Sequence, residues 1–146
     1  MPERQSSDAP RHIFTYGSLM FPAVWNGVVR GRYRSAGGTV HGFRRLAVRG
    51  EEHPALVIAP GAPPIRGVVY FDMGSDDVAR LDHFETTEYA RVAVAVTIDG
   101  TAIAADAYLA LNVDALLDQD WDVAAFERDG LQRFLARYAV VNAPDA

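Results

Sequence analysis

The chain has 146 residues, of which 49% are hydrophobic and 23% are charged. This length and composition favour a single globular domain with its own core and exclude a disordered chain. The sequence contains no cysteine, and all 14 basic residues are arginines. These absences exclude disulfides, thiol catalysis, thiolate metal sites and every mechanism that needs a lysine. No apolar run is long enough for a membrane helix, and no secretory signal precedes the first strand. We therefore expect a cytoplasmic protein that needs no cofactor.

The net charge of −5 is unevenly distributed along the chain. Residues 1–50 hold eight arginines and two acidic residues, whereas residues 51–146 hold six arginines and 17 acidic residues. Arg30, Arg32 and Arg34 alternate, which is typical of the solvent-facing side of an extended segment. Nucleic-acid binding through these arginines is the alternative, but no basic helix or aromatic platform accompanies them. We expect no nucleic-acid or membrane partner, and a monomer or homodimer.

The first half of the chain predicts short strands around one helix. Residues 1–10 are polar and are expected to form a loose tail. Residues 12–16 are rich in β-formers and stop at Gly17, which predicts a strand entering a tight turn. Apolar residues at helical spacing predict a helix over residues 19–29. Glycines divide residues 30–48 into short extended stretches.

Further strands are predicted at residues 54–58 and 65–71. Ser75 is a candidate N-cap for a helix that continues to about Phe84, with two acidic residues in its first turn.

The last third predicts a hairpin followed by a helix. Residues 89–98 form a long β run, and the Asp99-Gly100 pair favours a tight turn into residues 102–111. Residues 121–140 show an amphipathic helical pattern, although Gly130 costs about 1 kcal/mol relative to alanine. About six short strands and irregularly placed helices predict an α+β fold with a small mixed β-barrel. We expect one domain spanning residues 11–142.

The segment Tyr16-Gly17-Ser18-Leu19 follows the first predicted strand. A glycine at this point lets the backbone turn, so that successive amide N–H groups can point at one carboxylate or carbonyl oxygen. The alternative is a plain turn with no binding role.

A second segment, residues 81–85, ends in a carboxylate on the apolar side of the predicted helix. Glu85 lies roughly 20° from Val78 and 40° from Leu81 around the helix axis. Partial desolvation there would raise the pKa of Glu85, as suits a general base. The alternative is a helix that frays by Phe84 and leaves Glu85 in solvent.

Other catalytic chemistries find little support. The four histidines, His12, His41, His53 and His83, never fall three or four positions apart, so we expect no metal site. Ser18 lacks the Gly-x-Ser-x-Gly context of a nucleophile and has no assigned histidine.

Taken together, these segments resemble the γ-glutamylcyclotransferase-like superfamily, and in particular its small avirulence-induced and γ-glutamylamine-type members. The resemblance covers roughly residues 12–112 and extends to the ending around Trp121 and Phe126. The matching pieces, in order, are Tyr16-Gly17-Ser18-Leu19, Pro54-Ala55-Leu56-Val57, Gly67-Val68-Val69-Tyr70, Leu81-Asp82-His83-Phe84-Glu85, and Tyr89 with Arg91.

The resemblance implies a small β-barrel flanked by helices and a pocket between residues 16–19 and Glu85. It implies a reaction in which the α-amine of a γ-glutamyl group attacks its own γ-carbonyl, releasing 5-oxoproline and an amine or amino acid. Glu85 would be the catalytic acid and base. Tyr16, Gly17, Ser18, Leu19 and Tyr89 would bind the substrate, without a metal or cofactor.

The sequence departs from the resemblance directly after the glutamate. Many members have glycine there, whereas this chain has Thr86-Thr87. A hydroxyl residue after Phe84-Glu85 favours a γ-glutamylamine over glutathione as substrate. The alternative function is a small-molecule-binding module of the same fold that has lost catalysis.

Overall fold

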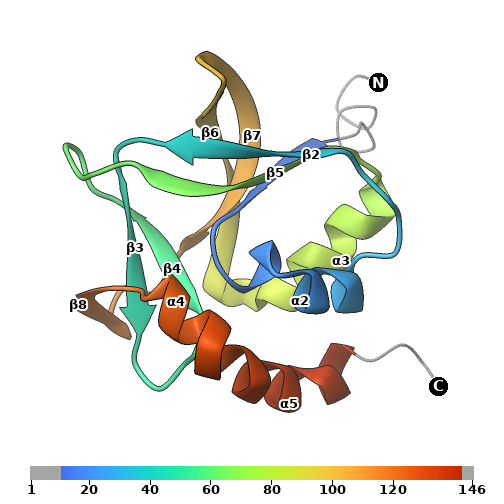
Figure 1. Ribbon diagram of the computed structural model, residues 1–146, viewed down its shortest axis with the longest axis vertical. Helices are drawn as coiled ribbons and strands as arrows, with labels where there is room; N and C mark the ends of the chain where they lie inside the picture. Colours follow the sequence, from blue (N-terminus) through green and yellow to red (C-terminus); the bar gives the residue numbers. More distant parts are fainter. Residues whose placement is uncertain (1–10, 143–146) are drawn as a thin grey trace.

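A computed structural model describes residues 11–142, with the side chains of residues 11–137. The expected tail, residues 1–10, lies outside the described residues. Five strands form a closed barrel (Figure 1). In order around it, they are β1 (Arg11–Thr15), β5 (Ile65–Met73), β2 (Ser35–Val40), β6 (Tyr89–Ile98) and β7 (Thr101–Ala110). The barrel closes where β1 pairs in parallel with β7. The predicted fold class, an α+β protein built on a small mixed barrel, is confirmed.

Three further strands extend the sheet beyond β7. They are β4 (Pro54–Ile58), β3 (Phe43–Val48) and β8 (Leu116–Asp120). β4 runs parallel to β7, and it pairs antiparallel with β3, which in turn pairs with β8. The segment that leads into β4 is therefore brought next to the end of β1, where the cavity described below is found.

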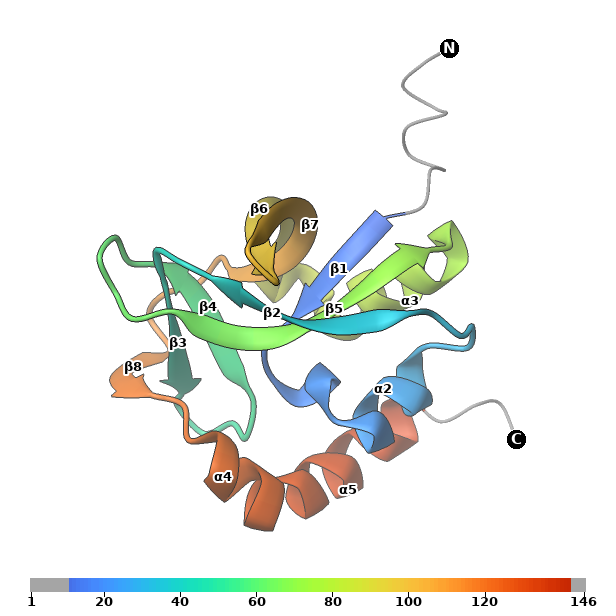
Figure 2. The same cartoon turned by 45° about the horizontal axis from the view of Figure 1, so that its top comes forward.

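The helices gather along one side of the barrel (Figure 2). α2 lies between α3 and α5 and contacts both. No helix in the described part of the chain is long and apolar enough to cross a membrane. The helical elements are the 3₁₀ turn η1 (Ser18–Met20), α2 (Pro22–Val28), α3 (Ser75–Glu85), the 3₁₀ turn η2 (Thr86–Glu88), α4 (Val123–Ala125), the π-turn η3 (Phe126–Gly130) and α5 (Leu131–Asn142).

Two apolar clusters follow from the alternation of side chains along the strands. On β1, Phe14 belongs to the cluster inside the barrel, whereas the adjacent Ile13 belongs to the cluster beneath the helices. Trp25 of α2 joins this second cluster and stacks on Tyr70 of β5, with ring centroids 3.7 Å apart. The helices are therefore fixed to the outside of the barrel by aromatic packing.

The structure differs from the sequence prediction in the number of strands, in the segment at residues 30–34 and at the start of α3. There are eight strands rather than about six, because residues 30–48 contain two and β8 was not predicted. The three arginines between residues 30 and 34 are exposed, as expected, but this segment forms no strand. The N-cap of α3 is Gly74, and Ser75 is already the first helical residue.

The loop from residue 30 to residue 34 takes its shape from a buried carboxylate instead of from a strand ladder. Asp77, in the first turn of α3, accepts hydrogen bonds from the amides of Arg30 and Gly31 and from the Tyr33 hydroxyl. These bonds satisfy backbone donors that a sheet would otherwise pair.

The C-terminal helix begins later than predicted and contains a π-turn. Asp122 is the N-cap, and its carboxylate accepts the amide of Ala125. A Cβ at Gly130 would lie 2.9 Å from the Glu52 carboxylate and 3.0 Å from the Phe126 ring. The helical cost of Gly130 is therefore offset by close packing against the 51–53 segment.

Gly67 should be intolerant of a side chain. A Cβ there would collide with the carbonyl oxygen of Thr15 and the Phe14 ring, where β1 meets β5. Gly67→Ala is expected to lower the free energy of unfolding by about 2–3 kcal/mol through overpacking. Gly37→Ala on the adjacent strand is the control, since its nearest neighbour lies 4.0 Å away. Urea denaturation of both variants checks this, and equal stabilities would contradict it.

Thr86 terminates α3 in a backbone conformation that favours glycine, with φ 64° and ψ −167°. Such a conformation costs a non-glycine residue on the order of 1–3 kcal/mol. Thr86→Gly is therefore expected to raise the free energy of unfolding by about 1 kcal/mol. The larger conformational entropy of glycine in the unfolded state opposes part of this gain.

The neighbouring Thr87 has no positive φ and provides the matched control. Thr87→Gly should leave the thermal midpoint unchanged or lower it. A lower midpoint for Thr86→Gly than for the wild type would show that the Thr86 conformation is not strained.

Candidate active site

A cavity of about 230 Å³ opens where the segment after β1, the end of α3 and the start of β6 meet. The segment after β1 is distant in sequence from the other two regions, and the closure of the barrel brings it next to them. All six residues that the sequence singled out line this one cavity: Tyr16, Gly17, Ser18, Leu19, Glu85 and Tyr89.

The loop from Tyr16 to Leu19 is held from two sides. Gly17 packs directly against Pro54, because a Cβ at Gly17 would lie 2.7 Å from the proline ring. The guanidinium of Arg45 donates to the carbonyl of Tyr16 at 3.0 Å. The glycine is thus required for close approach to β4, a reason that the sequence did not reveal.

The same loop offers hydrogen-bond donors. Ser18 and Leu19 open the 3₁₀ turn, so their amides have no acceptor within it. Ser18 is among the residues that line the cavity, and its hydroxyl is a further group able to donate a hydrogen bond. The loop therefore has the composition of an oxyanion or carboxylate site.

Tyr16 is buried, and its hydroxyl donates to the carbonyl of Tyr108 on β7 at 2.5 Å. Burial raises the pKa of Tyr16 well above its usual range, and the nearby Glu85 adds to this effect. The phenol therefore stays neutral and ties the end of β1 to β7. A direct contact between Tyr16 and a substrate remains a prediction.

The helix α3 runs through Glu85, so the alternative of a helix that frays at Phe84 is wrong. Glu85 is partly buried and lines the cavity. Among the residues that the structure describes, no side chain or amide forms a hydrogen bond or an ion pair with its carboxyl group. Burial, and to a lesser extent the negative charge of Asp82, raises the pKa of Glu85 to about 8. This carboxyl group can take up and release a proton near neutral pH.

Tyr89, the first residue of β6, lies across the cavity mouth from β4. Its hydroxyl donates to the carbonyl of Pro54 at 3.3 Å, so it links β6 to the segment that supports Gly17. Its ring also lies edge-on to His53, with centroids 6.4 Å apart. Binding of a substrate by the Tyr89 hydroxyl remains a prediction.

Sequence reasoning missed several residues at the cavity. Tyr108 lines it from β7 and donates its hydroxyl to Asp82, one helical turn before Glu85. The only available signal was the spacing of Asp82 and Glu85 on one helix face. Four further ionisable residues line the cavity without a sequence signal: Arg49, Glu51, His53 and Glu88.

His53 lies in the cavity wall, and its side chain is largely buried. Burial lowers the pKa of His53, so the imidazole is neutral at pH 7. The His53 Nδ1 atom lies 3.8 Å from Oε1 of Glu51, and the imidazole ring is edge-on to the ring of Phe134 on α5. Among the described residues, no three acidic or histidine side chains are arranged to hold a metal ion.

Comparison with known proteins agrees with this geometry. The family described as "Gamma-glutamyl cyclotransferase, AIG2-like" matches residues 13–123. AIG2-like protein A of Arabidopsis thaliana is 25% identical over 130 residues, which cover 87% of this chain and 78% of the relative.

Solved structures show the same fold. A solution structure of an Arabidopsis thaliana protein superposes with a TM-score of 0.67 at 24% identity, covering 93% of this chain and 94% of that one. A structure described as gamma-glutamyl cyclotransferase gives 0.63 at 16% identity, covering 92% and 89%. The match over residues 13–123 spans the barrel, the Tyr16–Leu19 loop and Glu85, and the chain therefore belongs to the AIG2-like gamma-glutamyl cyclotransferase family.

Proposed function

We propose that this protein is a cyclotransferase that converts a γ-glutamyl amine or γ-glutamyl amino acid into 5-oxoproline and the free amine. One observation carries the proposal: the carboxyl group of Glu85 lies in the cavity wall without a hydrogen-bond partner among the described residues. The same cavity is lined by Ser18 and Leu19, whose amides have no acceptor within the 3₁₀ turn. Membership of the family supports the same reaction.

The reaction moves two protons, one after the other, from the attacking nitrogen to the leaving nitrogen. The α-ammonium of the γ-glutamyl group first gives a proton to the Glu85 carboxylate, and the free amine then attacks the γ-carbonyl carbon. A five-membered ring forms with one new C–N bond. When the old C–N bond breaks, Glu85 gives its proton to the leaving nitrogen. The regenerated carboxylate then takes the second proton from the ring nitrogen, which leaves a neutral lactam, and passes it to the departing amine. A carboxyl group with a pKa of about 8 suits both steps at neutral pH.

The negative charge in this reaction develops on the γ-carbonyl oxygen. The amides of Ser18 and Leu19 and the Ser18 hydroxyl are the donors that would stabilise it, or that would bind the α-carboxylate. Gly17 keeps this loop against Pro54, so the donors are fixed before the substrate binds. Because the substrate supplies the nucleophile, the protein needs only a base and donors.

The decisive experiment offers the purified protein a panel of γ-glutamyl compounds, both amines and amino acids, and measures released 5-oxoproline. Glu85→Gln keeps the shape of the side chain but cannot accept the proton. It is expected to lower kcat by about 10²–10⁴-fold with little change in fold. Glu127→Gln, on the exposed surface of η3, is the matched control and should retain full activity.

Two results would contradict the proposal. Equal turnover by the wild type and Glu85→Gln would remove Glu85 from the chemistry. Tight calorimetric binding of γ-glutamyl compounds without any 5-oxoproline would instead favour the binding module of the same fold.

The activity should also depend on pH in a defined direction. In the free protein, the base form of Glu85 is populated above its pKa of about 8. Hence kcat/KM should rise about tenfold per pH unit from pH 5 to 7 and level off near pH 8. Initial rates at low substrate concentration over pH 5–9 check this. A plateau that already begins at pH 5 would show that Glu85 has an ordinary pKa.

A further inference from the structure

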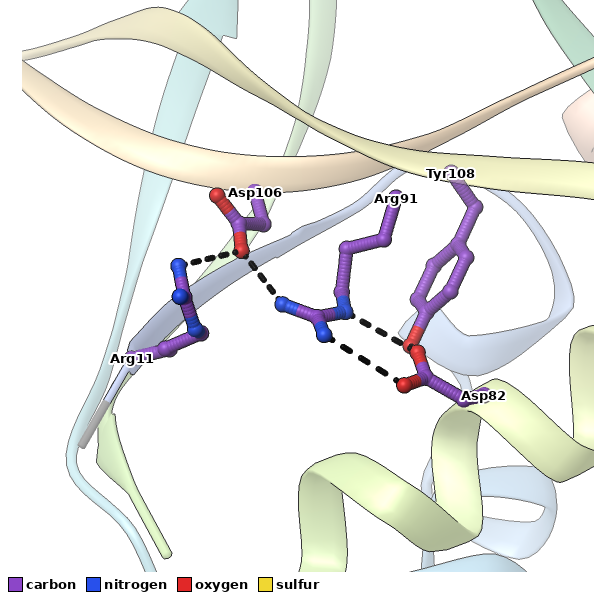
Figure 3. Close-up of polar contacts among 5 residues, drawn as sticks. All are labelled: Arg11, Asp82, Arg91, Asp106 and Tyr108. Carbon is purple, nitrogen blue, oxygen red and sulfur yellow. Dashed lines mark hydrogen bonds and ion pairs between the residues drawn. The ribbon is translucent and has the colours of Figure 1, made fainter. Parts of the chain in front are cut away.

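A chain of polar contacts beside the cavity leads from the barrel to the helix that carries Glu85 (Figure 3). Arg91 of β6 donates its Nε to Asp82 at 2.9 Å and its Nη1 to Asp106 at 2.7 Å. Asp106 also accepts from Arg11 of β1 at 3.1 Å, and Tyr108 donates to Asp82 at 2.6 Å. The contacts thus join three barrel strands to α3.

The burial of these groups identifies which contacts are held firmly. The Asp106 side chain is 12% exposed and that of Arg91 is 25% exposed, so the pair forms inside the protein wall. Asp82 is 44% exposed, yet it receives two donors from the barrel. Breaking a buried ion pair leaves a charge that water cannot fully solvate, so the Arg91 side chain has little freedom to move.

Asp82 precedes Glu85 by three residues, so both side chains leave α3 on neighbouring faces. We propose that Arg91 and Asp106 are positioning residues for the proposed reaction: Asp106 orients Arg91, Arg91 fixes and partly neutralises Asp82, and Asp82 in turn sets the place and the charge surroundings of Glu85. This inference rests on the proposed function for its catalytic meaning, but its physical content can be measured without turnover.

Two consequences follow from this arrangement. First, the bonds to Asp82 anchor the last turn of α3 against β6 and β7, which directs Glu85 to the cavity rather than to solvent. Second, the negative charge of Asp82 contributes to the raised pKa of Glu85, and Asp82 forms an ion pair with Arg91 at 2.9 Å. Without Arg91, the full charge of Asp82 would act on Glu85.

Other groups also face Glu85 and are present in every variant compared below. They are Tyr16 from the loop after β1, Tyr89 from β6, Tyr108 from β7, Arg49, Glu51 and His53 from the segment before β4, and Glu88 from η2. The experiment changes Asp82 and its partner Arg91, which also loses its bond to Asp106, and leaves these groups chemically unchanged.

The test is a ¹³C NMR titration of the Glu85 carboxyl group, assigned by its loss in Glu85→Gln. Asp82→Asn removes a like charge, so the titration midpoint should fall by about one pH unit. Arg91→Gln leaves the Asp82 charge unbalanced, so the midpoint should rise by about the same amount. In the Asp82→Asn background, Arg91→Gln should cause a smaller shift, because the part that arises from the lost contact with the Asp82 carboxylate is already gone.

Arg44→Gln is the matched control, since Arg44 also bonds two aspartates but lies on β3 and does not line the cavity. It should leave the midpoint unchanged. If Arg91→Gln does not fold, Asp82→Asn, which keeps an acceptor for Tyr108, decides alone. An unchanged midpoint in folded Asp82→Asn would overturn the inference, and so would an equal Arg91→Gln shift with and without the Asp82 charge.

The two proposals fail in different ways. Absence of 5-oxoproline release from the whole panel would remove the proposed function and leave the titration result standing. Turnover that depends on Glu85, together with a Glu85 titration midpoint that is unchanged in the Asp82 and Arg91 variants, would contradict only the positioning role. Where both hold, the rising limb of kcat/KM should move with pH in the same direction as the midpoint in each variant.

Discussion

The parallel pairing of β1 with β7 closes the barrel, and the cavity depends on this closure. Ile13 pairs with Asp106 at this seam, and the Tyr16 hydroxyl donates to the carbonyl of Tyr108 two residues further along β7. The seam fixes the end of β1, and with it the loop of amide donors that follows. It also places Tyr108 between that loop and α3. Each strand of the seam thus contributes both to the barrel core and to the site.

Burial around this seam gives the site its chemical character. Water-poor surroundings disfavour the charged form of Glu85, and the Asp82 carboxylate acts in the same direction. The protein tolerates this arrangement because Asp82 and Asp106 are balanced by Arg91 and Arg11. The structure therefore combines the Glu85 carboxyl group, which has no partner in the described residues, with two nearby aspartates, Asp82 and Asp106, that accept hydrogen bonds from arginines. Such contrast between neighbouring acids is a physical mark of functional sites.

Much of the fold could be predicted from local patterns. The alternation in residues 89–98, the Asp99-Gly100 turn and the helix that ends near Glu85 were all found, because each depends on residues close in sequence. β8 escaped prediction because its sequence, Leu116 to Asp120, has little β character and is held as a strand by its pairing with β3. The loop at Arg30 likewise depends on Asp77, which is distant in the chain.

The sequence by itself determined the barrel class, the loop of residues 16–19 and the placement of Glu85 on an apolar helix face, since periodicity and turn chemistry are local properties. Only the tertiary structure decided that Gly17 must be small, because Pro54 comes from another strand. It alone brought Tyr108, Asp82, Arg91 and Asp106 into one set of contacts beside Glu85. The physical reason is that burial and charge depend on distances in space, which the order of residues along a chain does not state.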